Sequence, residues 1–170
     1  MPIIAKYLTA FFVSMVPIIE LRGALPIAVG MGLPLVPSYI VCIVGNMVPV
    51  PFIFFFARKI LEWGKDKKVI GGFCRFCLEK GHKGGAKLQE KAGKGLFVAL
   101  MLFVGIPLPG TGAWTGTMAA SLLDMNFKKS VLAVLLGVLI AGVIMGLASA
   151  GIFGAIGAVT GAPIVATSAM

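Results

Sequence analysis

The chain has 170 residues, of which 59% are hydrophobic and only 12% are charged. A water-soluble domain carries about 25% charged residues, so this composition excludes an ordinary soluble fold and predicts an all-α integral membrane protein with a single membrane domain. The net charge of +9 is concentrated: eleven Lys/Arg and four Asp/Glu lie between Arg58 and Lys94. This clustering argues against nucleic acid as a partner and predicts a basic cytoplasmic loop.

The first half of the chain contains two short apolar stretches and one long one. Residues 3–19 are interrupted by Lys6 and Pro17, and residues 23–33 offer at most eleven positions for a helix. Such a helix spans roughly 16 Å of a hydrocarbon core that is about 30 Å thick. We therefore expect the two short arms to form a re-entrant hairpin, and residues 36–57 to form a transmembrane helix. No small-residue cleavage site follows the first stretch, so it is expected to belong to the mature protein.

The same order returns in the second half. Residues 96–106 and 113–123 are short apolar arms on either side of a Pro/Gly-rich break, and residues 131–159 form the longest apolar stretch. A shift of 90 positions places Pro17 on Pro107 and the first long stretch on residues 126–147. The sequence therefore predicts a two-fold internal repeat. Its expected boundaries are a first repeat at 1–57, the basic cytoplasmic loop at 58–95, a second repeat at 96–159 and a C-terminal tail at 160–170.

The distribution of charge predicts how the repeats are oriented. If the first hairpin opens outside the cell, residues 36–57 cross inward and deliver the basic loop to the cytoplasm. The second hairpin then enters and leaves on the cytoplasmic side, together with Lys128 and Lys129, and the last helix crosses back. The predicted fold is thus two inverted repeats in the cell (inner or plasma) membrane, each a re-entrant helical hairpin followed by a transmembrane helix. Lys6, on the outer face, does not fit the positive-inside rule.

Glu20 and Arg22 are the first candidate site. They lie two positions apart between Pro17 and Pro26, and an extended break there would place both side chains on one side. Ionisable residues at membrane depth indicate function. Glu20 is predicted to bind and release a proton or cation, and Arg22 to act as its counter-charge or as a clamp for an anionic group. The alternative is an interfacial pair that only caps the hairpin.

The second candidate site is the break between the later arms. A helix that begins after Gly112 presents free backbone N–H groups, which can bind an anion or a polar ligand. Thr111 and Thr115 add hydroxyl groups, and Trp114 adds a flat apolar wall. The alternative is a tight turn packed with small residues. Seven residues of the two candidate sites are expected to shape the backbone: Pro17, Gly23, Pro26, Pro107, Pro109, Gly110 and Gly112.

Several other residues are expected to serve packing. Asn46, just before Pro49, is predicted to hydrogen-bond between helices beside a kink. Asp124 and Asn126 are predicted to end the second hairpin and cap the last helix. Two Gly-x-x-x-Gly motifs permit close helix contact within the chain or across a homodimer. These motifs are Gly142-x-x-x-Gly146 and Gly157-x-x-x-Gly161.

The cysteines and the single histidine do not predict an enzyme or a cofactor. Cys74, Cys77 and His82 are three ligands, whereas a structural zinc site takes four, so they are expected to be bystanders. A metal shared across a dimer is the alternative. Cys42 is expected to pack in a helix. No Ser/His/Asp set can be assembled, so we expect neither an enzyme nor a metal site.

Two segments carry a resemblance to a known family. Glu20-Leu21-Arg22-Gly23-Ala24-Leu25-Pro26 and Pro107-Leu108-Pro109-Gly110-Thr111-Gly112-Ala113-Trp114-Thr115-Gly116 resemble the signature blocks of the putative small multi-drug export protein family. The resemblance runs from about Val16 to Gly146 and implies an exporter. The layout is also similar to that of the DedA/VTT superfamily, whose opposed re-entrant hairpins imply translocation of lipid carriers.

These observations predict a small secondary transporter, coupled to a proton or a cation. Its small or amphipathic substrate would bind between the two hairpin tips, at Glu20, Arg22, Thr111, Trp114 and Thr115. The expected partners are membrane lipids, a small-molecule or lipid-linked substrate and a second copy of the chain, because 170 residues are few for an alternating-access cavity. The alternatives are a flippase for lipid-linked phosphates, a passive pore, and an assembly factor that docks through the basic loop.

Overall fold

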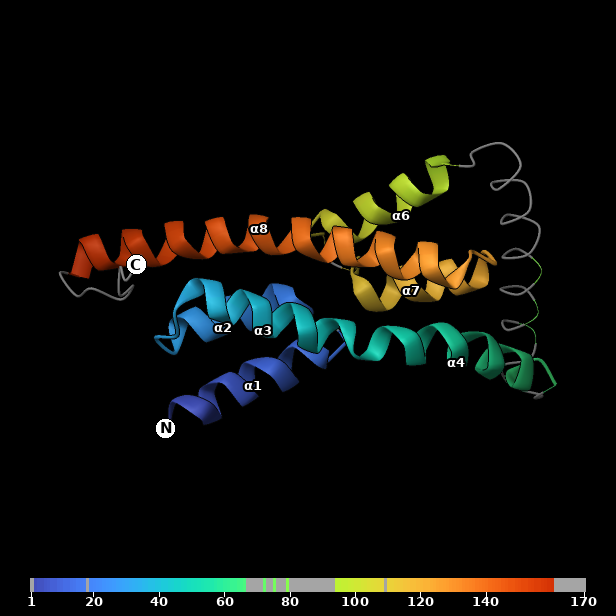
Figure 1. The fold of residues 1–170 in the computed structure, drawn as a ribbon, viewed down its shortest axis with the longest axis horizontal. Helices are drawn as coiled ribbons and strands as arrows, with labels where there is room; N and C mark the ends of the chain where they lie inside the picture. The colour runs from blue at the N-terminus through green and yellow to red at the C-terminus, as the bar shows by residue number, and fades with distance from the viewer. Residues whose placement is uncertain are drawn as a thin grey trace.

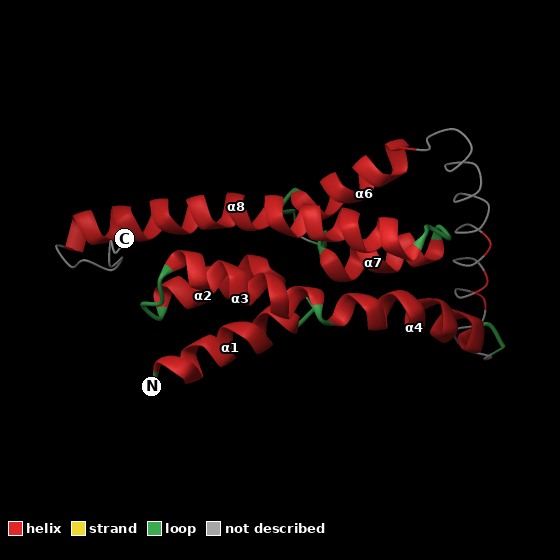
Figure 2. Cartoon of the chain, in the orientation of Figure 1, coloured by secondary structure: helices red, strands yellow, loops and turns green. Residues whose placement is uncertain are grey.

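A computed structural model describes residues 2–17, 19–66, 94–108 and 110–160, together with positions 72, 75 and 79. The described residues form helices and no strands, which confirms the all-α prediction (Figure 1, Figure 2). The helices in chain order are α1 (Ile3–Met15), α2 (Glu20–Gly30), α3 (Leu35–Met47), α4 (Pro49–Gly64), α6 (Lys94–Gly105), α7 (Ala113–Leu122) and α8 (Phe127–Thr160).

Two helical segments are long and apolar enough to cross a membrane. They are Leu35–Ala57, with 23 residues, and Phe127–Ile152, with 26 residues. The first joins α3 to α4 through Val48, which keeps helical dihedral angles (φ −57°, ψ −46°) and donates its N–H to the carbonyl of Val44 at 3.2 Å. Pro49 then starts α4, because the first position of a helix tolerates a residue without an N–H. The two segments overlap the stretches 36–57 and 131–159 that the sequence predicts to be transmembrane helices.

The remaining helices pair beside these two segments (Figure 1). α1 runs from the N-terminal end of the molecule to its middle, and α2 returns to the same end. α6 runs from the opposite end to the middle, and α7 returns there. Both connections, at residues 16–19 and 106–112, therefore lie near the middle of the molecule.

The two returning helices end in the same way. Two positions after the last residue of each helix, a residue has a positive φ. The N–H of the next residue then donates to a carbonyl five positions earlier, as in a Schellman motif. The next helix then begins in each case with a serine hydroxyl bonded to the carbonyl four residues earlier. The matching residues are Gly32 and Asp124, Leu33 and Met125, and Ser38 and Ser130. They lie 92 positions apart, whereas the predicted shift is 90.

Small residues let the helices approach closely. A Cβ atom on Gly142 would collide with the ring of Tyr39, whose hydroxyl donates to the carbonyl of Leu139 at 2.8 Å. Gly146 faces Leu25 and Leu35 at an ordinary contact distance. The motif formed by Gly142 and Gly146 therefore serves packing within the chain. Gly161 and the side-chain surroundings of Gly157 lie outside the described residues.

Three of the packing predictions are tested. The Oδ1 atom of Asn126 accepts the N–H of Lys128 at 3.0 Å, which confirms the cap of α8. Cys42 is fully buried, as expected for packing. Asn46 is also buried, but its Oδ1 atom has no hydrogen-bond partner, so the predicted bond between helices is wrong for that atom.

Lys6 donates to the carbonyl of Met31 at 2.6 Å, at the end of α2, where a cation is favoured by the helix dipole.

Cys74, Cys77 and His82, which are expected to be bystanders, and also Pro109, lie outside the described residues. Within the described part of the chain, no three His, Cys, Asp or Glu side chains gather as a metal site would require.

Candidate functional site

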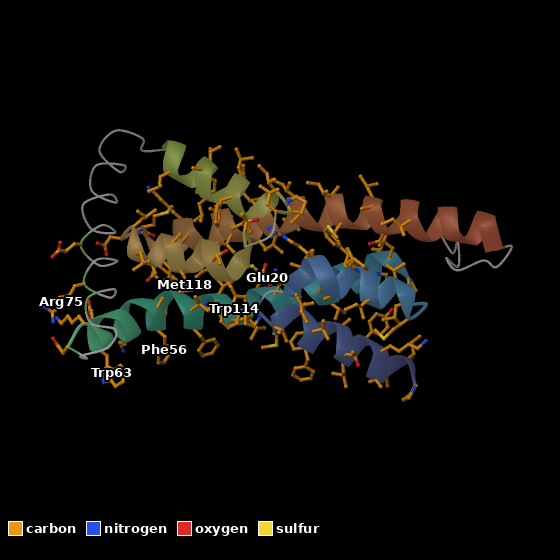
Figure 3. All side chains as sticks on the ribbon, turned by 180° about the vertical axis from the view of Figure 1, so that it is seen from behind. Glu20, Phe56, Trp63, Arg75, Trp114 and Met118 are labelled. Carbon is orange, nitrogen blue, oxygen red and sulfur yellow. The ribbon has the colours of Figure 1, made fainter. Side chains whose placement is uncertain are left out.

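The two connections in the middle of the molecule contact each other. We call the described residues of the range 15–22 the first tip and those of the range 104–114 the second tip. Figure 3 shows Glu20 of the first tip beside Trp114 of the second. The contacts between the tips are made by side chains of one tip and the free helix ends of the other.

Glu20 caps the start of α7. Its side chain is 6% exposed, and its two oxygens accept the backbone N–H groups of Ala113 and Trp114, each at 3.1 Å. These N–H groups open α7 and have no partner within the helix. A carboxylate is also favoured there by the positive end of the helix dipole. The N–H groups at the start of α7 therefore find their hydrogen-bond acceptor in Glu20, which precedes Ala113 by 93 residues.

Arg22 caps the end of α6. Its guanidinium donates to the carbonyls of Leu108 at 2.6 Å, Val104 at 2.9 Å and Ile106 at 3.2 Å. These carbonyls lie at and just after the last turn of α6, where the helix dipole is negative. A guanidinium suits them because its donors are fixed in a planar fork. Glu20 and Arg22 together form what we call the clasp, which holds both helix ends of the second tip.

The second tip also donates a side-chain hydrogen bond to the first tip. The indole N–H of Trp114 donates to the carbonyl of Met15 at 3.1 Å, at the end of α1. The hydroxyl of Thr111 lies 2.9 Å from the carbonyls of both Ile106 and Leu108, which Arg22 also reaches. Trp114 therefore donates to a carbonyl in the other half, as Arg22 does, whereas Thr111 donates within the second tip.

Gly112 makes room for the clasp. Its dihedral angles (φ 155°, ψ −171°) belong to a region that only glycine adopts readily, and a Cβ atom there would overlap the carboxylate of Glu20. Gly110 also has a positive φ of 81°, but a Cβ atom would meet nothing within 4 Å. Of these two glycines, only Gly112 therefore allows a close approach of another side chain, that of Glu20.

The backbone around Glu20 differs from the expected extended break. α2 already begins at Glu20, and Pro26 lies inside the helix rather than at the end of a break. Glu20 itself has a φ of 48°, a left-handed value that is uncommon for a residue with a side chain. Both side chains still reach the second tip, although the local structure that presents them is a helix start. Gly23 lies in this helix, where a Cβ atom would crowd the side chain of Ile19.

The start of α7 also differs from the prediction that its N–H groups await a ligand. The N–H groups of Ala113 and Trp114 are already bonded to Glu20. An anion could reach them only by displacing the carboxylate, so the positive helix end is used to join the two halves.

A cavity of about 430 Å³ lies against the clasp. This volume falls within the range of about 300–1,000 Å³ that is typical of ligand sites. The five residues predicted to bind substrate all line it, and Pro17, Pro107 and Gly110 complete the predicted part of the wall. Leu108 and Met145 also line it and were not predicted, because an apolar residue within a long apolar run carries no distinguishing signal. The predicted residues in the wall are Glu20, Arg22, Thr111, Trp114 and Thr115.

The sequence matches the family described as "Putative small multi-drug export protein" over residues 20–144. The chain belongs to this family. Comparisons with curated proteins and with solved structures gave no match. Membership in the export family, together with the two apolar helical segments, identifies a membrane protein.

The part of the chain that defines the export family contains the whole clasp. It begins at Glu20, and it includes every described residue of the cavity wall except Pro17 and Met145. The resemblance based on the two signature blocks is therefore confirmed for this family. The name of the family is consistent with a membrane transporter.

Proposed function

We propose that this protein is a small secondary transporter that exports a small or amphipathic substrate through the cavity between the two tips. The observation that carries the proposal is the clasp: two buried or half-buried charges join the halves of the molecule beside a cavity of ligand size. Charged residues at membrane depth are expensive, and they are found mainly on transport paths.

In this proposal the two halves are inverted repeats, and α1–α2 and α6–α7 are re-entrant hairpins. The matching ends of α2 and α7 support a repeat, since the same turn and the same serine bond recur 92 positions apart. The two helix pairs open toward opposite ends of the molecule, which supports inversion (Figure 1). Helices broken near the middle of a membrane and facing a cavity are typical of secondary transporters.

Glu20 is the proposed coupling residue. Its carboxylate faces two N–H donors, so a proton on Glu20 would remove the negative charge and would place an O–H group against a donor. The contact between the tips would then weaken. A proton could in this way change how the two halves sit against each other, which is the step that alternating access requires.

The proposed setting is the cell membrane, with residues 1–170 as one membrane domain that has no catalytic activity and forms a homodimer. The basic loop at 58–95 is proposed to be cytoplasmic. Lys128 and Lys129, at the start of α8, lie at the same end of the molecule as the last turn of α4, which supports this orientation (Figure 1).

Flux into liposomes tests the transporter directly. The purified protein would be reconstituted under an imposed pH gradient, with ethidium and a fluorescent alkyl phosphocholine as probes. We expect saturable, gradient-driven flux that falls to the level of empty liposomes in Glu20→Gln. The matched control is Glu62→Gln, an exposed carboxylate on α4, which should keep normal flux.

Each other outcome points to a different function. Unchanged flux in a monodisperse Glu20→Gln protein would remove proton coupling. Flux that does not saturate and needs no gradient would indicate a passive pore. Transfer of lipid-linked phosphates alone would favour the flippase, and no flux of any probe would favour the assembly factor.

Labelling of single cysteines tests the orientation. In a background without the native cysteines, Gly32→Cys and Arg75→Cys should react with an impermeant maleimide from opposite sides of the membrane. Reaction of both from the same side would contradict the inverted arrangement.

A further inference from the structure

An apolar groove lies beside the cavity. It has a volume of about 350 Å³ and runs between α4 and α7. Phe52 is 62% exposed, Phe56 54% and Met118 43%, so this wall opens outward. In a membrane protein such a surface meets the hydrocarbon chains of the lipid. The lining residues are Phe52, Ile53, Phe56, Ala57, Trp114 and Met118.

Trp114 is a wall of both the groove and the cavity. Figure 3 shows it between Glu20 on one side and Met118 and Phe56 on the other. Its backbone N–H is bonded to Glu20 and its indole N–H to Met15, so the position of the ring is held at two points. The two hollows are therefore neighbours across one fixed side chain.

The two hollows differ in chemistry. The cavity carries one formal charge of each sign, Glu20 and Arg22, and each is already opposed by a helix end. The groove is lined by apolar and aromatic side chains and carries no formal charge. Because the two charges of the cavity balance, a ligand that fills both hollows needs a part without net charge beside the clasp and an apolar part in the groove.

We propose that the substrate is an amphiphile with a net-neutral head, which binds with its head in the cavity and its alkyl chain in the groove. The groove between α4 and α7 is then a lateral entrance from the bilayer. This inference rests on the proposed function for the role of the cavity, and it adds the substrate class and the route of entry.

A second apolar groove lies elsewhere on the molecule. It lies between α8 and the α2–α3 pair and has a volume of about 200 Å³. The ring of Tyr39 is seated against Gly142 there, and its hydroxyl is bonded to Leu139. This groove shares no lining residue with the cavity, whereas the groove between α4 and α7 shares Trp114. Of the two, only the latter adjoins the cavity in this structure.

Quenching of tryptophan fluorescence tests the proposal. In Trp63→Phe, Trp114 is the one remaining tryptophan of the chain. The protein would be placed in lipid nanodiscs and titrated with a long-chain alkyl phosphocholine that carries bromine on its chain. We expect saturable quenching of Trp114 at a low mole fraction of the probe. The control reporter for bulk lipid contact is Leu102→Trp without the native tryptophans. Leu102 is 44% exposed on α6 and lines neither the groove nor the cavity, so its quenching should rise only in proportion to the probe.

A matched pair of substitutions tests the groove itself. Met118→Gln places an amide among the apolar residues of the groove and should weaken saturable quenching about tenfold. Leu102→Gln adds the same amide at nearly the same exposure and should leave it unchanged. Both proteins should elute as monodisperse species and keep the unfolding midpoint of the parent.

Three results would overturn the inference. The first is equal, non-saturating quenching of Trp114 and of the Leu102→Trp reporter. The second is full affinity in Met118→Gln. The third is competition by free choline phosphate as strong as that by the whole amphiphile. Ethidium flux without saturable quenching would remove this inference and keep the transporter, whereas saturable quenching without any flux would support the amphiphile site and remove the transporter.

Discussion

The two tips of this molecule contribute different groups to the contact between the halves. The first tip supplies charged side chains, Glu20 and Arg22, which cap helix ends in the other half. The second tip supplies helix ends that have no cap of their own, and it contains Gly110 and Gly112. Glycines on both tips would leave four helix ends without a cap. The first tip therefore supplies the caps that the second tip lacks, and this difference joins the two halves of the molecule.

The largest expected effect comes from filling the space beside the clasp. Gly112→Ala should lower the free energy of unfolding by about 4 kcal/mol, since it combines a disfavoured backbone with the displacement of a buried carboxylate. Unfolding by SDS in mixed micelles, followed by circular dichroism, would measure it. The matched control is Gly110→Ala in the same tip, where a positive φ alone should cost about 1 kcal/mol. Equal losses in the two variants would show that Gly112 has no special relation to Glu20.

Removal of the acidic half of the clasp should have the next largest effect. Glu20→Ala leaves the N–H groups of Ala113 and Trp114 without their partner and should cost about 3 kcal/mol. Glu20→Gly should cost about 1 kcal/mol less, because glycine adopts the φ of 48° without strain. The same SDS titration measures both, and a glycine variant less stable than the alanine variant would contradict the left-handed backbone at this position.

A change of the basic half should cost less. Arg22→Lys keeps the charge but replaces a planar fork by a single ammonium group, which cannot match the spacing of three carbonyls. We expect a loss of about 2 kcal/mol in the same titration. A lysine variant as stable as the parent would show that charge, rather than geometry, holds the end of α6.

The smallest expected effect is on the return contact. Trp114→Phe keeps an aromatic ring against the cavity but removes the N–H that bonds to Met15. One hydrogen bond of this kind contributes about 1 kcal/mol. Trp63→Phe is the control. If Trp114→Phe lowers the free energy of unfolding no more than this control does, the bond from Trp114 to Met15 does not stabilise the contact between the tips.

Much of the fold followed from the sequence, because membrane thickness fixes what a helix of a given length can do. The short stretches, the Pro/Gly breaks and the two long helical segments could all be located from hydropathy alone. The candidate site could also be located, since Glu20 and Arg22 are charges in an apolar region. Pro26 was misjudged as part of a break, because the packing of α2 tolerates a proline inside the helix.

What the sequence by itself determined is which residues are unusual: two charges in one tip, and glycines and prolines in the other. Only the tertiary structure decided how they are used, because the decisive contacts join residues more than 80 positions apart. It showed that the open helix end after Gly112 is occupied by Glu20 and that Gly112 rather than Gly110 must lack a side chain. It also showed that Trp114 lies between a cavity with two charged residues and a groove with none. The local sequence shows that a charge in an apolar region is energetically unfavourable or that a glycine can adopt unusual dihedral angles. The backbone groups that stabilise the charge are set by how the two halves pack.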